Sequence, residues 1–251
     1  MLLYYITDRR QFPGSATEQR AALLRKIAEA ARCGVDYIQL REKDLTAREL
    51  LELAKEAAAA IRSAAPKQPK TGIRKLETGN QKLETLLLIN SRLDVAVACG
   101  ADGVHLRSDD ISAADARAAW MKAAAARDSG LGTRDCVIAA SCHTAGEVRR
   151  AQSEGADFVV FAPVFEKGGE RGVGLEALRA VCRGLPEAST PRASPAVNIP
   201  VLALGGVTLE NARACLEAGA AGIAGIRLFQ DNDVAEVERR LRNIATAKDA
   251  K

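Results

Sequence analysis

Aromatic residues are scarce in this chain, and this limits the partners it can have. Phe, Trp and Tyr make up 4% of its 251 residues, and stacking on such side chains is a common way to hold nucleic-acid bases. The formal net charge is only +4, with 36 basic residues set against 32 acidic ones. This balance lacks the basic excess that is typical of nucleic-acid binding. We therefore expect small-molecule partners and no nucleic acid.

Long hydrophobic runs and paired cysteines are missing as well. No apolar stretch approaches the roughly 20 residues that span a bilayer. The opening residues MLLYYITDRR have no basic segment ahead of their apolar ones, as a signal peptide would have. The six cysteines form no CxxC pair, which favours reduced, packed thiols. We expect a cytoplasmic protein with no membrane partner.

Short apolar runs alternate with amphipathic stretches along the chain. The runs are nearly continuous, which is typical of parallel strands buried on both faces; they cover 2–7, 37–41, 86–90, 103–106, 136–140, 158–161, 201–204 and 222–226. The amphipathic stretches predict helices over 17–32, 46–63, 92–99, 112–127, 144–153, 175–183, 208–217 and 233–247. Ser15, Thr46 and Thr144 each precede a Glu by three residues, a spacing that predicts capping boxes.

Eight strand–helix units in 251 residues predict one (β/α)8 TIM barrel domain over residues 1–251. A doubly wound sheet is the alternative, although it rarely needs eight regular units. Two polar stretches, 65–84 and 186–198, interrupt the alternation between a helix and the next strand. In a barrel such insertions fall at the amino-terminal face, away from the chemistry. We expect both insertions to be mobile.

The second strand has the most distinctive end. Gln39, Arg41 and Lys43 recur at every second position of the run QLREKD, so an extended strand points all three side chains to one face. An amide, a guanidinium and an ammonium on one face make poor core and a good anion site, because Arg matches phosphate bidentately. A polar strand end running into a solvated loop is the plainer alternative.

Other predicted strands also end in polar residues, and in a barrel such ends meet at one mouth. Asn90 ends the third strand, and Ser141 follows the fifth. Loops after the seventh and eighth strands of barrels often bind phosphate. A phosphate site is accordingly predicted at Gly205, Gly206, Ile226 and Arg227. A tight turn is the alternative.

Three further residues invite a chemical interpretation. Asp110 lies among cations, where a carboxylate is a candidate Mg²⁺ ligand or, alternatively, a helix cap. His143 follows a buried strand and is a candidate acid/base group or a packed histidine. His105, the only other histidine, is expected to be a structural residue that points into or across the barrel.

Together these residues resemble the thiamine phosphate synthase and thiazole tautomerase superfamily. The resemblance covers nearly the whole chain apart from the two polar stretches. It is carried by QLREK (39–43), LIN (88–90), GADGVHL (100–106), SCHT (141–144) and IPVLALGG (199–206). It implies a (β/α)8 enzyme of thiamine biosynthesis.

The resemblance implies a synthase that joins hydroxymethylpyrimidine pyrophosphate to thiazole phosphate and releases pyrophosphate. Lys43, Ser141 and His143 are then the candidate catalytic residues. The implied binding residues are Gln39 for the pyrimidine, Arg41, Lys43 and Asn90 for the pyrophosphate, Gly205, Gly206, Ile226 and Arg227 for the thiazole phosphate, and Asp110 for Mg²⁺.

Three positions depart from the synthase pattern. Ser91 stands where the synthases usually carry Asp, the loop 166–172 lacks their Thr-x-Thr-Lys stretch, and Arg227 replaces a small Ser. The short glycine-rich loop is similar to the tautomerase branch, in which a His at the position of His143 is the acid/base and no metal is needed. A non-catalytic paralogue that binds a phosphate ligand is a third possibility, and a homo-oligomer is a further open expectation.

Overall fold

Eight parallel strands close into a barrel in the computed structural model, which describes residues 1–64, 84–126, 136–166, 169, 171–184 and 197–249. The strands pair in chain order, and β1 pairs with β8 to close the ring. They are β1 (Leu2–Ile6), β2 (Tyr37–Leu40), β3 (Leu86–Asn90), β4 (Gly103–Leu106), β5 (Val137–Cys142), β6 (Phe158–Phe161), β7 (Val201–Ala203) and β8 (Gly222–Gly225). The predicted (β/α)8 barrel is confirmed.

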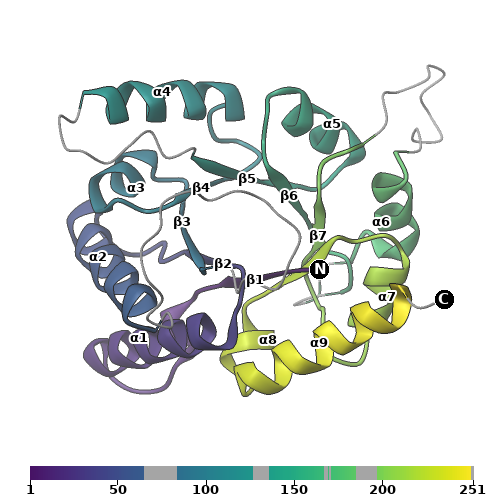
Figure 1. Cartoon of the computed structure of the whole chain (residues 1–251), viewed down its shortest axis with the longest axis horizontal. Coiled ribbons are helices and arrows are strands. Elements are labelled where there is room, and N and C mark those ends of the chain that lie inside the picture. The colour runs from purple at the N-terminus through teal and green to yellow at the C-terminus, as the bar shows by residue number, and fades with distance from the viewer. Residues whose placement is uncertain (65–83, 127–135, 167–168, 170, 185–196, 250–251) are drawn as a thin grey trace.

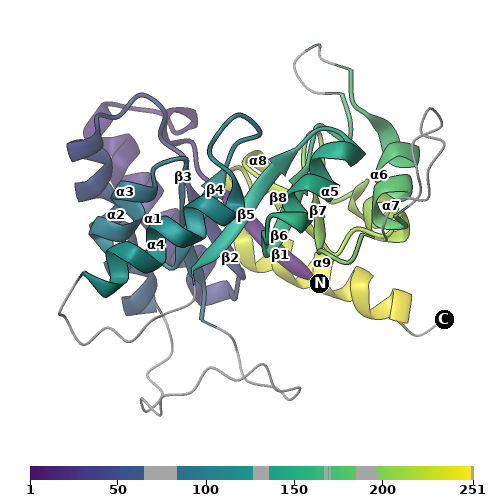
Figure 2. The same ribbon diagram turned by 90° about the horizontal axis from the view of Figure 1, so that it is seen from above.

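Helices surround the strand ring, as Figures 1 and 2 show from two directions. They are α1 (Ala16–Cys33), α2 (Ala47–Ala64), α3 (Leu93–Cys99), α4 (Ala113–Ala125), α5 (Ala145–Ser153), α6 (Gly174–Cys182), α7 (Ala212–Glu217), α8 (Arg227–Gln230) and α9 (Val234–Asp249). None of those in the described ranges has the length and hydropathy of a membrane span. The polar stretches 65–84 and 186–198 fall almost wholly outside the described residues, so their placement stays a prediction.

Local sequence signals account for most helix ends. The capping boxes predicted at Ser15 and Thr144 are both present, and Thr46 exchanges the same pair of hydrogen bonds with Glu49. Each box satisfies backbone N–H groups that would otherwise lack a partner in the first turn. At the other end, Gly34 terminates α1 with φ +79°, a left-handed conformation that favours glycine.

The helix predicted over 208–217 is wrong at its start, because α7 begins at Ala212. The Thr208 N–H donates to Asn211 Oδ1 at 2.8 Å, and Asn211 Nδ2 donates to the Gly206 carbonyl at 2.9 Å. These side-chain bonds hold a turn in place of the first helical turn. The sequence reading also missed α8, whose Gln230 amide accepts from the Asp8 N–H at 2.9 Å and donates to the Asp8 carbonyl at 3.1 Å.

The apolar core consists of two layers. The larger layer lies between the strands and the helices, and the smaller one fills the barrel interior; the interior layer includes Tyr4, Ile6, Leu88, Ala139, Phe158, Val160, Leu202 and Ala224. Since side chains alternate along a strand, residues two positions beyond these also face inward. Gln39, Asn90, His105 and Ser141 share that parity. They form a polar layer above the apolar one, at the carboxyl-terminal end of the barrel.

Candidate active site

An amide pair links the ends of β2 and β3. Gln39 Nε2 donates to Asn90 Oδ1 at 3.0 Å, and Asn90 Nδ2 lies 3.2 Å from Ser91 Oγ. Only 2% of Gln39 is exposed. The pair fixes both amides at the inner wall of the mouth, and within the described ranges no residue bonds to Gln39 Oε1, which leaves this oxygen for a ligand.

Four basic side chains, Arg10, Arg41, Lys43 and Arg107, form what we call the cation cluster. Burial lowers the pKa of Arg41, and nearby Arg41 is the largest cause of the lowered pKa of Lys43, with Arg107 and Arg10 adding to it. Neither Arg41 nor Lys43 forms an ion pair with any residue in the described ranges. Positive charges that repel one another around an opening attract an anion. The structure therefore places Arg41 and Lys43 near each other, although β2 ends at Leu40 and Lys43 lies in the turn that follows, beyond the extended strand that the spacing assumed.

Glu42 lies on the opposite face of this strand end and was missed as a functional residue. Its carboxylate accepts from Thr7 Oγ1 at 2.6 Å and from the Arg9 guanidinium at 3.0 Å. The Arg9 N–H also reaches it at 3.1 Å, and the Glu42 side chain is 1% exposed. Thr7 Oγ1 in turn accepts from the Arg41 N–H at 3.0 Å. Glu42 thus anchors the backbone that carries Arg41 and Lys43. The available signal in the sequence was an acidic residue placed between the two cations Arg41 and Lys43.

Ser141 is held by two inward-facing residues. Its Oγ lies 2.8 Å from His105 Nε2, and His105 Nδ1 lies 3.0 Å from the Tyr4 hydroxyl. Burial lowers the pKa of His105 to about 3, so the imidazole is neutral at physiological pH. The expected position of His105, on a strand and pointing into the barrel, is confirmed, but its contact with Ser141 was missed. The shared inward parity of Tyr4, His105 and Ser141 was the available signal.

The buried imidazole makes the fold sensitive to acid. Because the pKa of His105 is lowered on folding, the unfolded chain binds more protons between about pH 3 and pH 6.5, and stability falls as pH falls through that window. From pH 7 to pH 5 this one group should remove about 2 kcal/mol of unfolding free energy. Denaturant unfolding measures the unfolding free energy at pH 7 and at pH 5. The difference between these two values should be smaller in His105→Gln than in wild type. His143→Gln, which changes the other histidine, should keep the wild-type difference; equal differences in all three proteins would contradict the prediction.

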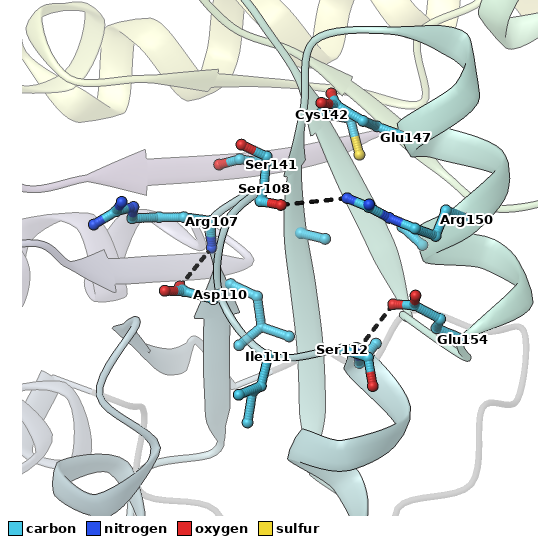
Figure 3. Close-up of a pocket in the computed structure, with 14 residues that line it drawn as sticks. Arg107, Ser108, Asp110, Ile111, Ser112, Ser141, Cys142, Glu147, Arg150 and Glu154 are labelled. Atoms are coloured by element: carbon cyan, nitrogen blue, oxygen red, sulfur yellow. Dashed lines mark hydrogen bonds between the residues drawn. The ribbon is translucent and has the colours of Figure 1, made fainter.

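Asp110 lies in the β4–α4 loop and folds back on that loop. Its Oδ2 accepts from the Arg107 N–H at 2.7 Å, while the Arg107 side chain pairs with Asp109. The cap of α4 is Ser112 rather than either aspartate. Asp110 also lines a cavity of about 220 Å³, which includes Ser141 but neither Arg41 nor Gln39 (Figure 3). Of the cation cluster, Arg107 lines the cavity, which lies under the β4–α4 loop.

Backbone groups are the candidate ligand donors after β7 and β8, further round the barrel mouth. Gly205 and Gly206 have φ of +95° and +63°. A Cβ built on Gly206 would lie 2.8 Å from Phe165 Cβ, so only glycine fits there. Within the described residues, no group accepts from the N–H of Gly206 or Arg227. These donors lie in the segments after β7 and β8, where the phosphate site is predicted.

His143 stands apart from the Ser141 network. Its Nδ1 lies 2.7 Å from the Ala162 carbonyl oxygen. A carbonyl only accepts, so Nδ1–H donates to it, and Nε2 has no hydrogen-bond partner among the described residues. The imidazole is exposed and is oriented between β5 and β6. This geometry is compatible with an acid/base role and does not require one.

A (β/α)8 barrel with polar residues and cations at the carboxyl ends of its strands belongs to the class of barrel enzymes. Comparison with known proteins narrows the class. Residues 3–229 match the family model described as thiamine monophosphate synthase. The chain belongs to this family.

Individual relatives agree with the family match. The chain is 34% identical over 230 residues to a putative thiamine-phosphate synthase 2 of Aquifex aeolicus, with 90% of this chain and 96% of the relative covered. It is also 34% identical to a thiamine-phosphate synthase of Methanoculleus marisnigri, with 98% and 96% covered. A solved thiamine phosphate pyrophosphorylase of Pyrococcus furiosus superposes with a TM-score of 0.68 at 28% identity, over 98% of this chain and 96% of that one.

Proposed function

We propose that the chain is a thiamine phosphate synthase, which couples hydroxymethylpyrimidine pyrophosphate with thiazole phosphate. The bond between the pyrimidine methylene carbon and the pyrophosphate oxygen breaks, and pyrophosphate leaves with the electron pair. The thiazole nitrogen then forms the new bond to that carbon, so no oxidant or reductant is needed. The observation that carries the proposal, beside family membership, is the unpaired Arg41 and Lys43 next to the Gln39–Asn90 amide pair.

The leaving pyrophosphate is the group that the cation cluster would stabilise. Arg41 and Lys43 supply positive charge, and Asn90 and Ser141 supply neutral hydrogen bonds. Their positions are set before the substrate binds, since Gln39 holds Asn90 and His105 holds Ser141. Preorganised donors of this kind stabilise the charge that develops in the transition state. Gln39 Oε1 would orient the pyrimidine ring.

The thiazole phosphate would lie across the mouth, against Gly205, Gly206 and the backbone of Ile226 and Arg227. Free N–H groups at strand ends suit a phosphate, and the Arg227 side chain is exposed and has no ion-pair partner among the residues described. The two binding regions lie at the carboxyl ends of β2–β3 and β7–β8, around one barrel mouth. In this proposal the thiazole nitrogen would lie beside the departing pyrophosphate.

Magnesium is part of this proposal, and the donor set for it is sparse. No cluster of three or more His, Cys, Asp or Glu side chains that would hold a metal exists within the described ranges. Asp110 Oδ1 is available, because only Oδ2 is used by the Arg107 N–H. One carboxylate together with phosphate oxygens is a usual Mg²⁺ environment, so the residues fit the ion. When bound, Mg²⁺ neutralises charge on the pyrophosphate.

Ser91→Asp should tighten Mg²⁺ binding, because it adds a second carboxylate beside Asn90. Ser91 has φ +57°, a left-handed conformation that Asp tolerates better than most residues. We expect the Mg²⁺ concentration for half-maximal activity to fall about tenfold, about 1.4 kcal/mol. Mg²⁺ titration of the variant and of Ser91→Asn, which adds the same bulk without charge, measures this. An equal response of both variants would remove Ser91 from the metal environment.

A thiazole tautomerase is the second candidate, and the observation that supports it is the His143 geometry. Because the Nδ1–H of His143 donates to the Ala162 carbonyl, its Nε2 could take a proton from the thiazole substrate and return it. This reaction would use neither pyrophosphate nor metal. The non-catalytic paralogue is the third candidate, on the same barrel.

A coupling assay separates the three candidates. Both phosphorylated substrates with Mg²⁺ should yield pyrophosphate if the chain is a synthase. Absence of pyrophosphate, together with thiazole isomerisation that His143→Ala abolishes, would identify the tautomerase. Thermal stabilisation by either substrate without turnover of any kind would identify the binding paralogue.

A further inference from the structure

We propose that Tyr4 and His105 are positioning residues, which hold the Ser141 hydroxyl as a hydrogen-bond donor toward an oxygen of the bound pyrophosphate. The identity of that anion rests on the proposed synthase function. The hydrogen-bond chain itself, here called the Tyr4–His105–Ser141 chain, is a property of the protein alone. Tyr4 and His105 would act through Ser141 without touching the substrate.

The three residues come from separate strands and meet inside the barrel. Tyr4 is on β1, His105 on β4 and Ser141 on β5. The Tyr4 hydroxyl lies 3.0 Å from His105 Nδ1, and His105 Nε2 lies 2.8 Å from Ser141 Oγ. Tyr4 is fully buried and His105 is 2% exposed, whereas Ser141 is partly exposed. The Tyr4–His105–Ser141 chain thus runs from the closed barrel interior to the open mouth.

The buried Tyr4 hydroxyl determines the direction of both hydrogen bonds in the Tyr4–His105–Ser141 chain. The only partner of the Tyr4 hydroxyl among the described residues is His105 Nδ1. If Nδ1 carried the proton, the tyrosine oxygen would accept it, and the tyrosine hydrogen would be buried without an acceptor, which is costly. The tyrosine therefore donates to Nδ1. In a neutral imidazole the proton then lies on Nε2.

The direction set at Tyr4 continues to Ser141. Nε2–H donates to Ser141 Oγ, so the serine hydrogen is not used inside the protein. Ser141 Oγ has no other partner in the described part of the chain, and its hydrogen is free to point into the mouth. A hydroxyl that is already accepting a hydrogen bond is also a better donor. An anion at the mouth thus meets a donor and is not repelled by serine lone pairs.

Removing the buried Tyr4 hydroxyl tests the Tyr4–His105–Ser141 chain. Tyr4→Phe should lower kcat for pyrophosphate release by about 5- to 10-fold, the value of one hydrogen bond, because both tautomers of His105 become accessible. Tyr37→Phe is the matched control. Its ring packs on Tyr4 with centroids 6.0 Å apart, and its hydroxyl has no hydrogen-bond partner among the residues described. Tyr37→Phe should leave kcat unchanged; equal losses in the two variants would overturn the proposal.

A double-mutant cycle separates positioning from a general structural effect. In a Ser141→Ala background, Tyr4→Phe should cause no further loss of kcat, because the group through which Tyr4 acts is already missing. A loss of the same size with and without Ser141 would overturn the proposal, since it would place the effect of Tyr4 elsewhere.

The tautomer can be observed without any substrate. Long-range proton–nitrogen NMR spectra of the full-length protein should show His105 as the Nε2–H tautomer. This tautomer should stay the same from pH 8 to pH 5. The chain has two histidines, so the spectrum of His143→Gln assigns the signals. A dominant Nδ1–H form of His105 would overturn the inference even if synthase activity is intact.

If the wild type releases no pyrophosphate, the proposed function fails instead. Calorimetry with inorganic pyrophosphate then replaces kcat; weaker binding by Tyr4→Phe and unchanged binding by Tyr37→Phe are expected, and equal binding would overturn the inference.

Discussion

Arg41→Ala should lower kcat/KM for the pyrimidine pyrophosphate by about 100- to 1,000-fold, the usual effect of removing one preorganised group from developing negative charge. Arg41 is half-buried and directly follows β2, and Lys43 lies two residues further on. Burial already lowers its pKa, so its charge is poorly solvated and interacts strongly with an anion. Initial rates of pyrophosphate release measure the effect.

The control for this prediction is Arg10→Ala. Arg10 is a member of the same cation cluster, but its side chain is 60% exposed and lies 3.8 Å from Asp8. Its removal should change kcat/KM by less than about 3-fold, because exposed charges are screened. Arg41→Lys should fall between wild type and Arg41→Ala, since it keeps the charge and loses the bidentate fork. If Arg41→Ala retains wild-type kinetics, the assignment of the pyrophosphate region is wrong.

Arg41 and Lys43 should also be coupled. Arg41 is the largest cause of the lowered pKa of Lys43, so its removal lets Lys43 hold its proton more firmly. The losses caused by Arg41→Ala and Lys43→Ala should therefore not add in the double variant. This coupling follows from the repulsion inside the cation cluster and needs no direct contact between the two side chains.

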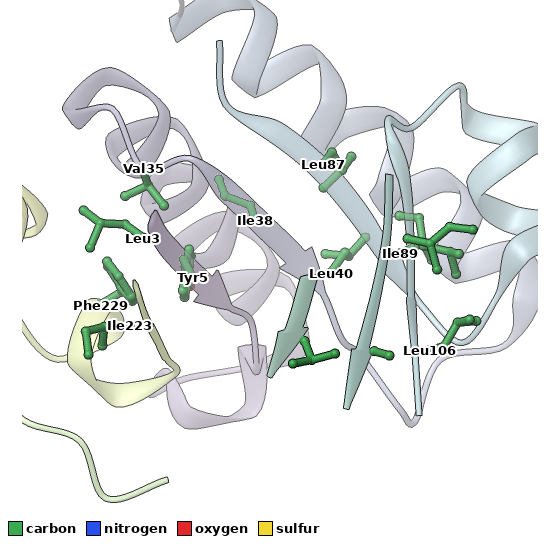
Figure 4. Close-up of a cluster of buried hydrophobic side chains, with 14 of the residues drawn as sticks. Leu3, Tyr5, Val35, Ile38, Leu40, Leu87, Ile89, Leu106, Ile223 and Phe229 are labelled. Atoms are coloured by element: carbon green, nitrogen blue, oxygen red, sulfur yellow. The ribbon is translucent and has the colours of Figure 1, made fainter. Parts of the chain in front are cut away.

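The strand ring was predictable because burial on both faces leaves a simple trace in sequence. Residues such as Leu3, Tyr5 and Ile38 point outward to the helices, as Figure 4 shows, while Tyr4 and its inward neighbours fill the interior. Both faces need apolar side chains, so the strands read as short continuous runs. The start of α7 was not predictable in this way, because the side-chain bonds of Thr208 and Asn211 compete with helix formation and depend on the Gly206 carbonyl.

The candidate site was predictable where one strand carries the pattern and unpredictable where partners come from distant strands. Gln39 follows from the alternation of β2, and Arg41 and Lys43 follow from their position directly after that strand. The partners of Glu42, Thr7 and Arg9, follow β1. The partner of Ser141, His105, comes from β4 and is itself bonded to Tyr4 of β1. No local pattern encodes contacts at these sequence separations. Such residues look like ordinary strand or motif positions until the barrel closes. The placement of Asp110 and of the thiazole-phosphate residues as ligands stays a prediction.

Glu42→Gln should lower the free energy of unfolding by about 3 kcal/mol, because breaking one partner of a buried ion pair leaves the other charge uncompensated. The side chains of Glu42 and Arg9 are 1% and 10% exposed, and they lie 3.0 Å apart. Urea unfolding measures the loss. Asp44→Asn is the matched control, since Asp44 binds the same guanidinium at 2.7 Å but is 38% exposed; we expect it to cost less than about 1 kcal/mol.

The same substitution should also slow the reaction, and this second effect distinguishes an anchoring role from simple stability. Thr7 Oγ1 connects Glu42 to the Arg41 N–H, so loss of the carboxylate frees the backbone that aims Arg41 and Lys43. At a temperature where Glu42→Gln is fully folded, kcat/KM should fall about tenfold, the cost of about 1.4 kcal/mol of misplacement. Replacing the pair together, Arg9→Met with Glu42→Leu, should recover most of the stability, because apolar residues of similar volume often replace a buried ion pair without loss. It should not recover the rate, since neither new side chain can bond to Thr7. Recovery of both would mean that Glu42 supports the fold alone and leaves the cation cluster to position itself.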